Sequence, residues 1–372
     1  LPLFERVYAS DGTVNLSRTR KRDRLVADFG EQGYDYAGNA WADLPVWHDA
    51  RQAIVVSRSV TLLARARAQA RVAQVFADTP PRLLQWPRAL RMHQWIKNLL
   101  LFLPLLLSQK FTEPKLLLAL WGFAAFCLCA SSVYLLNDLL DMPSDRLHPR
   151  KRLRPFASGE LPALDGLLLA PLLLGMALVI ALEISRWFTS VLLVYYASTL
   201  AYSMYLKRIP LIDVMLLAGL YTLRIVAGAA AIGVPLTFWL LAFSMFLFLS
   251  LGTMKRYTEL AMVRDSGAMR AAGRGYHADD LPLLRNQGVA AGYGSVLVLA
   301  LYINSPQSLM LYRHPHYLWL LCPLLLYWIS RAWMKTHRGL MHDDPIVFAL
   351  RDIPSLTVGV LMAAAVAIAA LL

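Results

Sequence analysis

Cysteine and acidic residues are both scarce in this chain of 372 residues, and each shortage excludes a class of protein. Its three cysteines, Cys127, Cys129 and Cys322, all lie inside apolar segments, so the sequence predicts neither a disulfide framework nor a cysteine metal cluster. Lys and Arg number 37 against 24 Asp and Glu, which leaves a net charge of +13. These basic residues gather in short loops beside apolar segments, a pattern that is typical of membrane proteins and argues against nucleic-acid binding.

Long hydrophobic runs are missing from the first 90 residues but fill residues 95–372. Overall 58% of the residues are hydrophobic, whereas a soluble domain has about 45–50%. The opening LPLFERVYAS lacks the architecture of a secretory signal peptide. Because the first residue is Leu1 and not Met, we expect the chain to begin inside a longer gene product.

Nine segments have the apolar character of membrane spans, for which a helix needs about 20 residues. With the N-terminal region in the cytoplasm, the loops on that side carry sixteen Lys and Arg and the opposite loops carry four. The positive-inside rule therefore predicts a cytoplasmic N-terminus in a bacterial-type inner membrane. The predicted fold is an all-α polytopic membrane protein with nine transmembrane helices and a small partial α/β N-terminal segment. The predicted spans are 94–109, 116–136, 164–183, 187–206, 211–232, 236–252, 287–303, 316–333 and 354–372.

Three carboxylates at the end of the second span have helical spacing. Asp138, Asp141 and Asp145 stand at i, i+3 and i+7, so on a helix they point within about 60° of one another. Such carboxylates repel each other unless a cation lies between them, and Mg²⁺ prefers oxygen ligands that it shares with phosphates. A solvated acidic helix end is the alternative, although charges at a membrane helix end are costly without a partner. We therefore predict a Mg²⁺ site at these residues.

A basic loop follows the carboxylates directly, with five Lys or Arg in nine residues. Guanidinium and ammonium groups beside a metal site suit a diphosphate, whose oxygens they contact where the metal does not. Anchoring of the loop at the cytoplasmic face is an alternative that the same residues satisfy. The predicted diphosphate-binding residues are Arg146, Arg150, Lys151, Arg152 and Arg154.

The stretch NDLLDMPSDRLHPRKRLRPFASG, residues 137–159, resembles the first signature of the UbiA superfamily of intramembrane prenyltransferases, N-D-x-x-D-x-x-x-D. The resemblance covers about residues 85–372. It implies a bundle of nine transmembrane helices, in agreement with the nine predicted spans. It also implies that Asn137, with the three aspartates, binds Mg²⁺ and the diphosphate of the donor.

The second signature of that family, another D-x-x-x-D, is replaced here by GTMKRYTEL, residues 252–260. Lys255 and Glu259 share a helix face by their spacing, and the pair is also compatible with a simple surface ion pair. This stretch, with RMHQWIKN at 91–98 and HDDPIVFALRD at 342–352, resembles the polyprenyl-phosphate phosphoribosyltransferases. That branch implies phosphoribosyl diphosphate as donor, a polyprenyl phosphate as acceptor and a cell-envelope sugar precursor as product.

We therefore predict a Mg²⁺-dependent transferase that moves phosphoribose to a polyprenyl phosphate, with prenyl transfer from a prenyl diphosphate to an aromatic acceptor as the alternative. A transporter would not need aligned carboxylates beside a phosphate-binding loop. Asp213 and Arg224, inside one span, are predicted to face the cavity, or to form a buried structural pair. The predicted catalytic residues are Asp138, Asp141, Lys255, Tyr257 and Glu259. The predicted substrate-binding residues outside the basic loop are Asn137, Arg91, Lys97, Arg224 and Arg256.

Residues 1–58 resemble the C-terminal half of a haloacid-dehalogenase-like phosphohydrolase. The resemblance implies phosphate binding by Ser10 and Lys21, and an acidic metal motif at Asn39 and Asp43. If ASDGT is the nucleophile motif, Ala9 stands where its aspartate belongs, so the module is inactive or its nucleophile lies upstream of Leu1. We expect 59–84 to form a linker helix and 85–372 the transferase domain.

Overall fold

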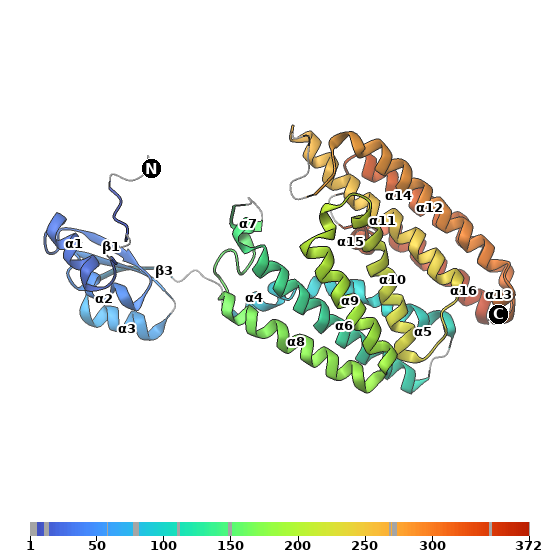
Figure 1. Cartoon of the computed structure of the whole chain (residues 1–372), viewed down its shortest axis with the longest axis horizontal. Coiled ribbons are helices and arrows are strands. Elements are labelled where there is room, and N and C mark those ends of the chain that lie inside the picture. The colour runs from blue at the N-terminus through green and yellow to red at the C-terminus, as the bar shows by residue number, and fades with distance from the viewer. Residues whose placement is uncertain are drawn as a thin grey trace. The chain divides into compact units, whose positions relative to one another are not determined.

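The computed structural model divides the chain into two compact units, Leu1–Leu84 and Gln85–Leu372 (Figure 1). Each unit has its own hydrophobic core and is described by itself. The structure describes residues 6–10, 15–57, 59–76, 82–109, 112–147, 151–267, 269, 274–341 and 344–371.

The N-terminal unit is built on a parallel three-stranded sheet in the order β1-β2-β3. Trp47 and Leu62 are buried against the middle strand, which alternates buried and exposed residues. The predicted linker helix over 59–84 is wrong in part: α3 is followed by a strand that pairs with β2. The elements are α1 Thr19–Phe29, β1 Asp35–Gly38, η1 Trp41–Asp43, α2 Leu44–His48, β2 Gln52–Val56, α3 Val60–Gln69 and β3 Val72–Phe76.

The second unit is a helical bundle (Figure 1). Its first half consists of α4 Arg82–Ala89, the 3₁₀ helix η2 Met92–Phe102, α5 Leu103–Ser108, α6 Glu113–Leu140, α7 Met142–Leu147, η3 Lys151–Leu153, α8 Ala163–Ile184, α9 Arg186–Met204 and η4 Leu206–Arg208. Its second half consists of α10 Ile212–Ile232, α11 Phe238–Asp265, η5 Ala278–Asp280, α12 Leu281–Ile303, α13 Pro306–Leu311, η6 Pro315–Leu320, α14 Leu321–His337, α15 Pro345–Arg351 and α16 Ile353–Leu371.

Six helices in the described part of the chain are long and apolar enough to cross a membrane: α6, α8, α10, α11, α12 and α16. The helical membrane fold is thus confirmed, whereas nine crossings are not. The first predicted span, 94–109, is a 3₁₀ helix continued by the short α5, which has Pro104 in its first turn. The predicted spans 187–206 and 316–333 correspond to α9 and α14. Several side chains of α9 are hydroxyls, and α14 is only 17 residues long.

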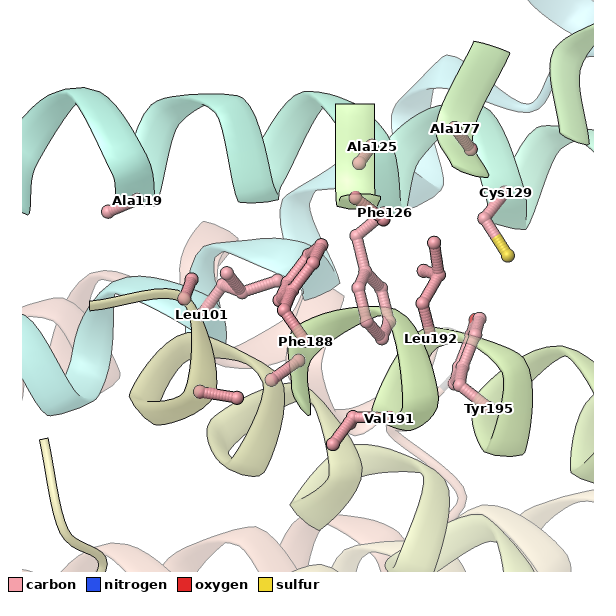
Figure 2. Packing of buried hydrophobic residues seen from close by; sticks show 14 of the residues in the cluster. Leu101, Ala119, Ala125, Phe126, Cys129, Ala177, Phe188, Val191, Leu192 and Tyr195 are labelled. Carbon is pink, nitrogen blue, oxygen red and sulfur yellow. The ribbon is translucent and has the colours of Figure 1, made fainter. Parts of the chain in front are cut away.

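Side-chain packing between α6, α9, α10 and η2 forms the larger core of the bundle. Figure 2 shows Phe126 of α6 among Phe188, Leu192 and Tyr195 of α9, and the rings of Phe126 and Tyr195 are 4.5 Å apart. Because lipid tails are as apolar as these side chains, van der Waals contact and not water exclusion is what holds such helices together. The core therefore depends on close fit.

The closest fit in this core brings η2 against α10 at Gly228. A Cβ atom at Gly228 would lie 2.0 Å from the carbonyl oxygen of Leu101, so only glycine permits this approach. Lys97 lies four residues before Leu101 on the same helix, and Arg91 is the N-cap of η2. The contact at Gly228 therefore sets the position of both cations along the axis of the bundle.

Candidate active site

Asp138 in the last turn of α6 and Asp145 on α7 are both buried and share one guanidinium between them. Arg154 donates to Asp138 at 3.2 Å and to Asp145 at 2.5 Å. Arg91 also donates to Asp138, at 2.5 Å, and its guanidinium lies 5.0 Å from the ring centre of Tyr134. The side chains of Asp138 and Asp145 are only 3% and 2% exposed, so their charges require such partners.

Asp141 does not join that pair. Its side chain is 41% exposed and lies 3.8 Å from Lys207. Asp141 is the C-cap of α6, and its backbone N–H still donates to the carbonyl of Asn137, so the helix is unbroken up to this residue. The three-residue step places Asp141 about 60° around the helix from Asp138, and its carboxylate pairs with Lys207 of η4 instead. Among the described residues no group of three or more His, Cys, Asp and Glu side chains is arranged to hold a metal ion. Asp138 and Asp145 thus converge on Arg154, whereas Asp141 does not join them.

The residues at this point nevertheless have the donor chemistry of a Mg²⁺ site. Arg154 is a cation placed between two buried carboxylates, so that position already favours positive charge. The side-chain oxygen of Asn137, one residue away, is buried with no hydrogen-bond partner. An unsatisfied buried oxygen on the residue that precedes Asp138 is the kind of ligand that Mg²⁺ takes.

The rest of the basic loop behaves differently from Arg154. Arg146 donates to the backbone carbonyl of Ala157 at 3.3 Å, while Lys151 and Arg152 are exposed on η3. Arg150 lies outside the described residues. Arg154 of the basic loop therefore contacts the carboxylates, whereas Arg146 binds a backbone carbonyl.

A second charged cluster joins η2, α11 and the segment before α15. Lys97 and Lys255 donate to the same carboxylate oxygen of Asp344, at 2.7 and 3.1 Å. Burial alone would raise the pKa of Asp344, but Lys255 and Lys97 outweigh it and lower the pKa to about 2. The ammonium of Lys97 also faces the ring of Tyr221 at 5.7 Å. The structure thus brings two predicted site lysines together through a carboxylate that the sequence alone did not assign.

Tyr257 and Glu259 do not share a site with Lys255. Glu259 pairs with the neighbouring Arg256, whose guanidinium also contacts the buried Asp213 at 2.7 Å. The hydroxyl of Tyr257 lies 3.2 Å from the imidazole of His337, on α14. The i, i+4 spacing allowed a pair between Lys255 and Glu259, but Lys255 binds Asp344, and Glu259 binds Arg256 of the same helix.

Arg224 is structural in this arrangement. It is buried and donates to Asn98 at 2.9 Å, to the carbonyl of Leu220 at 2.7 Å and to the hydroxyl of Tyr195 at 2.9 Å. A guanidinium whose three nitrogens all have protein partners is a poor candidate for binding phosphate. Asp213 is also satisfied within the protein: the hydroxyl of Tyr276 donates to it at 2.5 Å. Of the two readings open for this span, the structural one fits both residues, although they do not pair with each other.

The N-terminal unit holds a small polar cluster around Lys21. Lys21 donates to the hydroxyl of Tyr36 at 2.9 Å and to Asp43 at 3.1 Å. Burial raises the pKa of Asp43, but Lys21 and the backbone N–H groups of Ala40 and Asn39 outweigh it, so the pKa lies below its usual range. Lys21 and Ser10 line one cavity of about 330 Å³. The structure therefore brings Ser10, Lys21 and Asp43 into one region. Asn39 contributes its backbone N–H, which donates to Asp43.

These observations define the class first: a multi-pass helical membrane protein in which one arginine bridges a carboxylate of α6 and a carboxylate of α7. The particular family follows from comparison with known proteins. The chain belongs to the UbiA prenyltransferase family, whose sequence model matches residues 99–353, and it is accordingly a transferase.

Three relatives describe the family context. An uncharacterized protein, y4nM, of Sinorhizobium fredii is 37% identical over 97% of this chain and 70% of its own length. A decaprenyl-phosphate phosphoribosyltransferase of Mycolicibacterium smegmatis is 37% identical over 53% of this chain and 64% of its own length. The structure of a UbiA homologue from Archaeoglobus fulgidus, bound to DMAPP and Mg²⁺, covers 76% of this chain and 99% of its own with a TM-score of 0.58. At 17% identity, that likeness shows the fold alone.

Proposed function

We propose that this protein is a Mg²⁺-dependent transferase that moves phosphoribose from phosphoribosyl diphosphate to a polyprenyl phosphate and releases diphosphate. The observation that carries the proposal is the cluster of Lys97, Lys255 and Asp344, in which Lys255 belongs to the stretch 252–260 that replaces the family's second aspartate motif. Cations at this place favour a donor with an additional anionic group. The mycobacterial phosphoribosyltransferase relative, with more than a third of residues identical over half of this chain, supports the same choice.

The residues around Asp138 would hold the diphosphate end of the donor. Asp138, Asp145 and Asn137 supply the oxygens that fit Mg²⁺, which when bound neutralises charge on the leaving diphosphate. Arg91 and Arg154, which now contact the carboxylates, are placed to donate to diphosphate oxygens as the bond breaks.

The transfer breaks the bond between the anomeric carbon and the diphosphate oxygen, and the bonding electrons leave with the diphosphate. An oxygen of the acceptor phosphate forms the new bond to that carbon. Because the acceptor is already an anion, no side chain has to remove a proton from it. The proposed reaction therefore needs no general base, and Asp344, whose pKa Lys255 and Lys97 lower to about 2 against the effect of burial, would be a weak one.

Prenyl transfer from a prenyl diphosphate to an aromatic or other small acceptor is the second candidate. The carboxylate pair with Asn137 favours it equally, because every diphosphate donor needs that end of the site. The two reactions differ at the other end: a prenyl chain offers no charge to the two lysines, whereas a sugar phosphate does.

The assay that separates the two candidates uses membranes that contain the protein. One reaction receives labelled phosphoribosyl diphosphate with a polyprenyl phosphate, and a parallel reaction receives labelled prenyl diphosphate with 4-hydroxybenzoate. We expect label in the lipid fraction of the first reaction and its loss in Asp138→Asn. Label in the aromatic product alone would replace the first candidate by the second.

We place the protein in a bacterial-type inner membrane with Asp138 and the N-terminus on the cytoplasmic side. The sixteen basic residues of the loops on that side support this orientation. Labelling of single cysteines introduced at Ser144 and at Arg313 by an impermeant thiol reagent in intact cells tests it. We expect modification at position 313 only; modification at 144 only would reverse the topology.

For the N-terminal unit we propose a haloacid-dehalogenase-like module, which the parallel sheet and the contacts of Lys21 with Asp43 support. The sheet extends this module to about residue 76. Hydrolysis of p-nitrophenyl phosphate that disappears in Lys21→Met would identify it as active. Hydrolysis that persists in the variant would separate the activity from this cluster.

A further inference from the structure

Lys97, Lys255 and Asp344 have a geometry that suits more than a structural ion pair. Both ammonium nitrogens contact the same oxygen of Asp344, so they lie at most about 6 Å apart. Two donors at this separation can bind different oxygens of one phosphate group. The side chains of Lys97 and Asp344 are 9% and 10% exposed, so an anion that entered would be held in a largely dry place, where charge interactions are strong.

The cluster carries more positive charge than its carboxylate neutralises. Two ammonium groups face one carboxylate, which leaves a net charge of +1. The surroundings are also basic: burial first, and then Arg91, Lys97 and Arg351, lower the pKa of His93, which precedes Lys97 on η2. A local excess of cations of this kind attracts a multiply charged anion.

The position of the cluster along η2 sets its distance from the carboxylates of α6. Arg91, which contacts Asp138, is the N-cap of η2 and precedes Lys97 by six residues. At about 2 Å per residue the two backbone positions are about 12 Å apart along the helix axis. The backbone of Arg91 is left-handed (φ 51°), so the direction of its side chain is given by its contact with Asp138 and not by the helical repeat. One small molecule with a diphosphate at one end and a phosphate at the other can therefore reach both groups of cations, and so can two phosphorylated molecules that meet between them.

We propose that Lys97 and Lys255 form a binding site for a phosphate monoester, with Asp344 as the residue that positions them. The inference rests on the proposed function and deepens it, because phosphoribosyl transfer involves two such groups, the 5-phosphate of the donor and the head group of the lipid acceptor. When a phosphate binds, its oxygens accept the hydrogen bonds that the two ammonium groups now donate to Asp344. No proton is transferred. Asp344 still holds the start of α15, since it also accepts from the backbone N–H of Ile346 at 3.1 Å.

The first test measures binding without turnover. Ribose 5-phosphate and a short polyprenyl phosphate are titrated separately into the purified full chain and into Lys255→Met. We expect at least tenfold weaker binding of one ligand: ribose 5-phosphate if the site takes the donor, the lipid if it takes the acceptor. The matched control is Lys335→Met, since Lys335 contacts Asp352 at 3.0 Å and is 30% exposed, against 35% for Lys255. Unchanged binding of both ligands to Lys255→Met would overturn the inference.

The second test separates positioning by Asp344 from a general structural role. Asp344→Asn should raise the KM of the same substrate at least tenfold while kcat stays within about threefold, and Asp344→Glu should restore most of that KM. A fall in kcat with both KM values unchanged would refute positioning. Failure of the proposed function is distinguishable, because it appears as absent phosphoribosyl transfer by the unaltered protein, whereas ribose 5-phosphate binding reports on the lysines alone.

Discussion

The substitution Gly228→Ala tests how tightly the site depends on the approach of η2 to α10. The added Cβ would lie 2.0 Å from the carbonyl oxygen of Leu101 and 2.8 Å from its carbonyl carbon, and both are backbone atoms that cannot rotate away. Ordinary contact begins near 3.4 Å, so η2 has to move by more than about 1 Å. The same displacement would move Lys97, four residues away on η2, and Arg91, the N-cap of η2.

Two effects of different size are expected. Overpacking costs about 1–3 kcal/mol of stability, partly offset by about 1 kcal/mol from the better helix propensity of alanine. Turnover should fall much more, by about 100-fold, because a shift of 1 Å in positioning groups has that effect on catalysis. The measurements are thermal unfolding of the detergent-solubilised protein and phosphoribosyl transfer in membranes.

Gly219→Ala on the same helix provides the control. A Cβ atom there has no neighbouring atom within 4 Å, so this variant gains helix propensity without displacing η2. We expect unchanged turnover and equal or higher thermal stability. If Gly228→Ala retains the turnover of Gly219→Ala, the position of η2 does not control the site and the reasoning is refuted.

Three further predictions concern charge. Asp145→Asn should reduce turnover at least 100-fold in the membrane assay, since it removes one of two carboxylates around Arg154; an effect below threefold would remove Asp145 from the site. The folded-state pKa of Asp344 is depressed to about 2 from an ordinary value near 4, so its contribution of about 2 kcal/mol is present above pH 4 and is lost as pH falls from 4 to 2. In acid unfolding, Asp344→Asn should not show this loss of stability between pH 4 and pH 2. An equal loss in the variant and in the unaltered protein would contradict the prediction. Arg224→Met should lower stability by about 3 kcal/mol or more in thermal unfolding, because it leaves Asn98 and Tyr195 buried without their partner; a shift equal to that of an exposed control, Arg152→Met, would refute its structural role.

The spacing of Asp138 and Asp145 within one stretch of chain predicted that their side chains lie close together, and the structure brings both to the guanidinium of Arg154. Asp141 was expected on the same face, but its side chain is 41% exposed and pairs with Lys207 of another element. Spacing along one helix gives no sign of such a partner.

Non-local contacts decided the features that the sequence could not give. Lys255 is bound by Asp344, 89 residues away, so helical spacing suggested Glu259 as its partner instead. Likewise, β3 (Val72–Phe76) pairs in parallel with β2, and nothing in its own short sequence indicates that pairing. For the first predicted span, apolar composition was read correctly but the local backbone, 3₁₀ up to Phe102, was not.

Arg154 lies between Asp138 and Asp145, so the chain itself supplies a counter-ion at the predicted metal site. Two buried carboxylates would otherwise repel each other while the helices assemble in the bilayer. We therefore expect removal of divalent metal to abolish turnover in the membrane assay while the melting temperature stays almost unchanged.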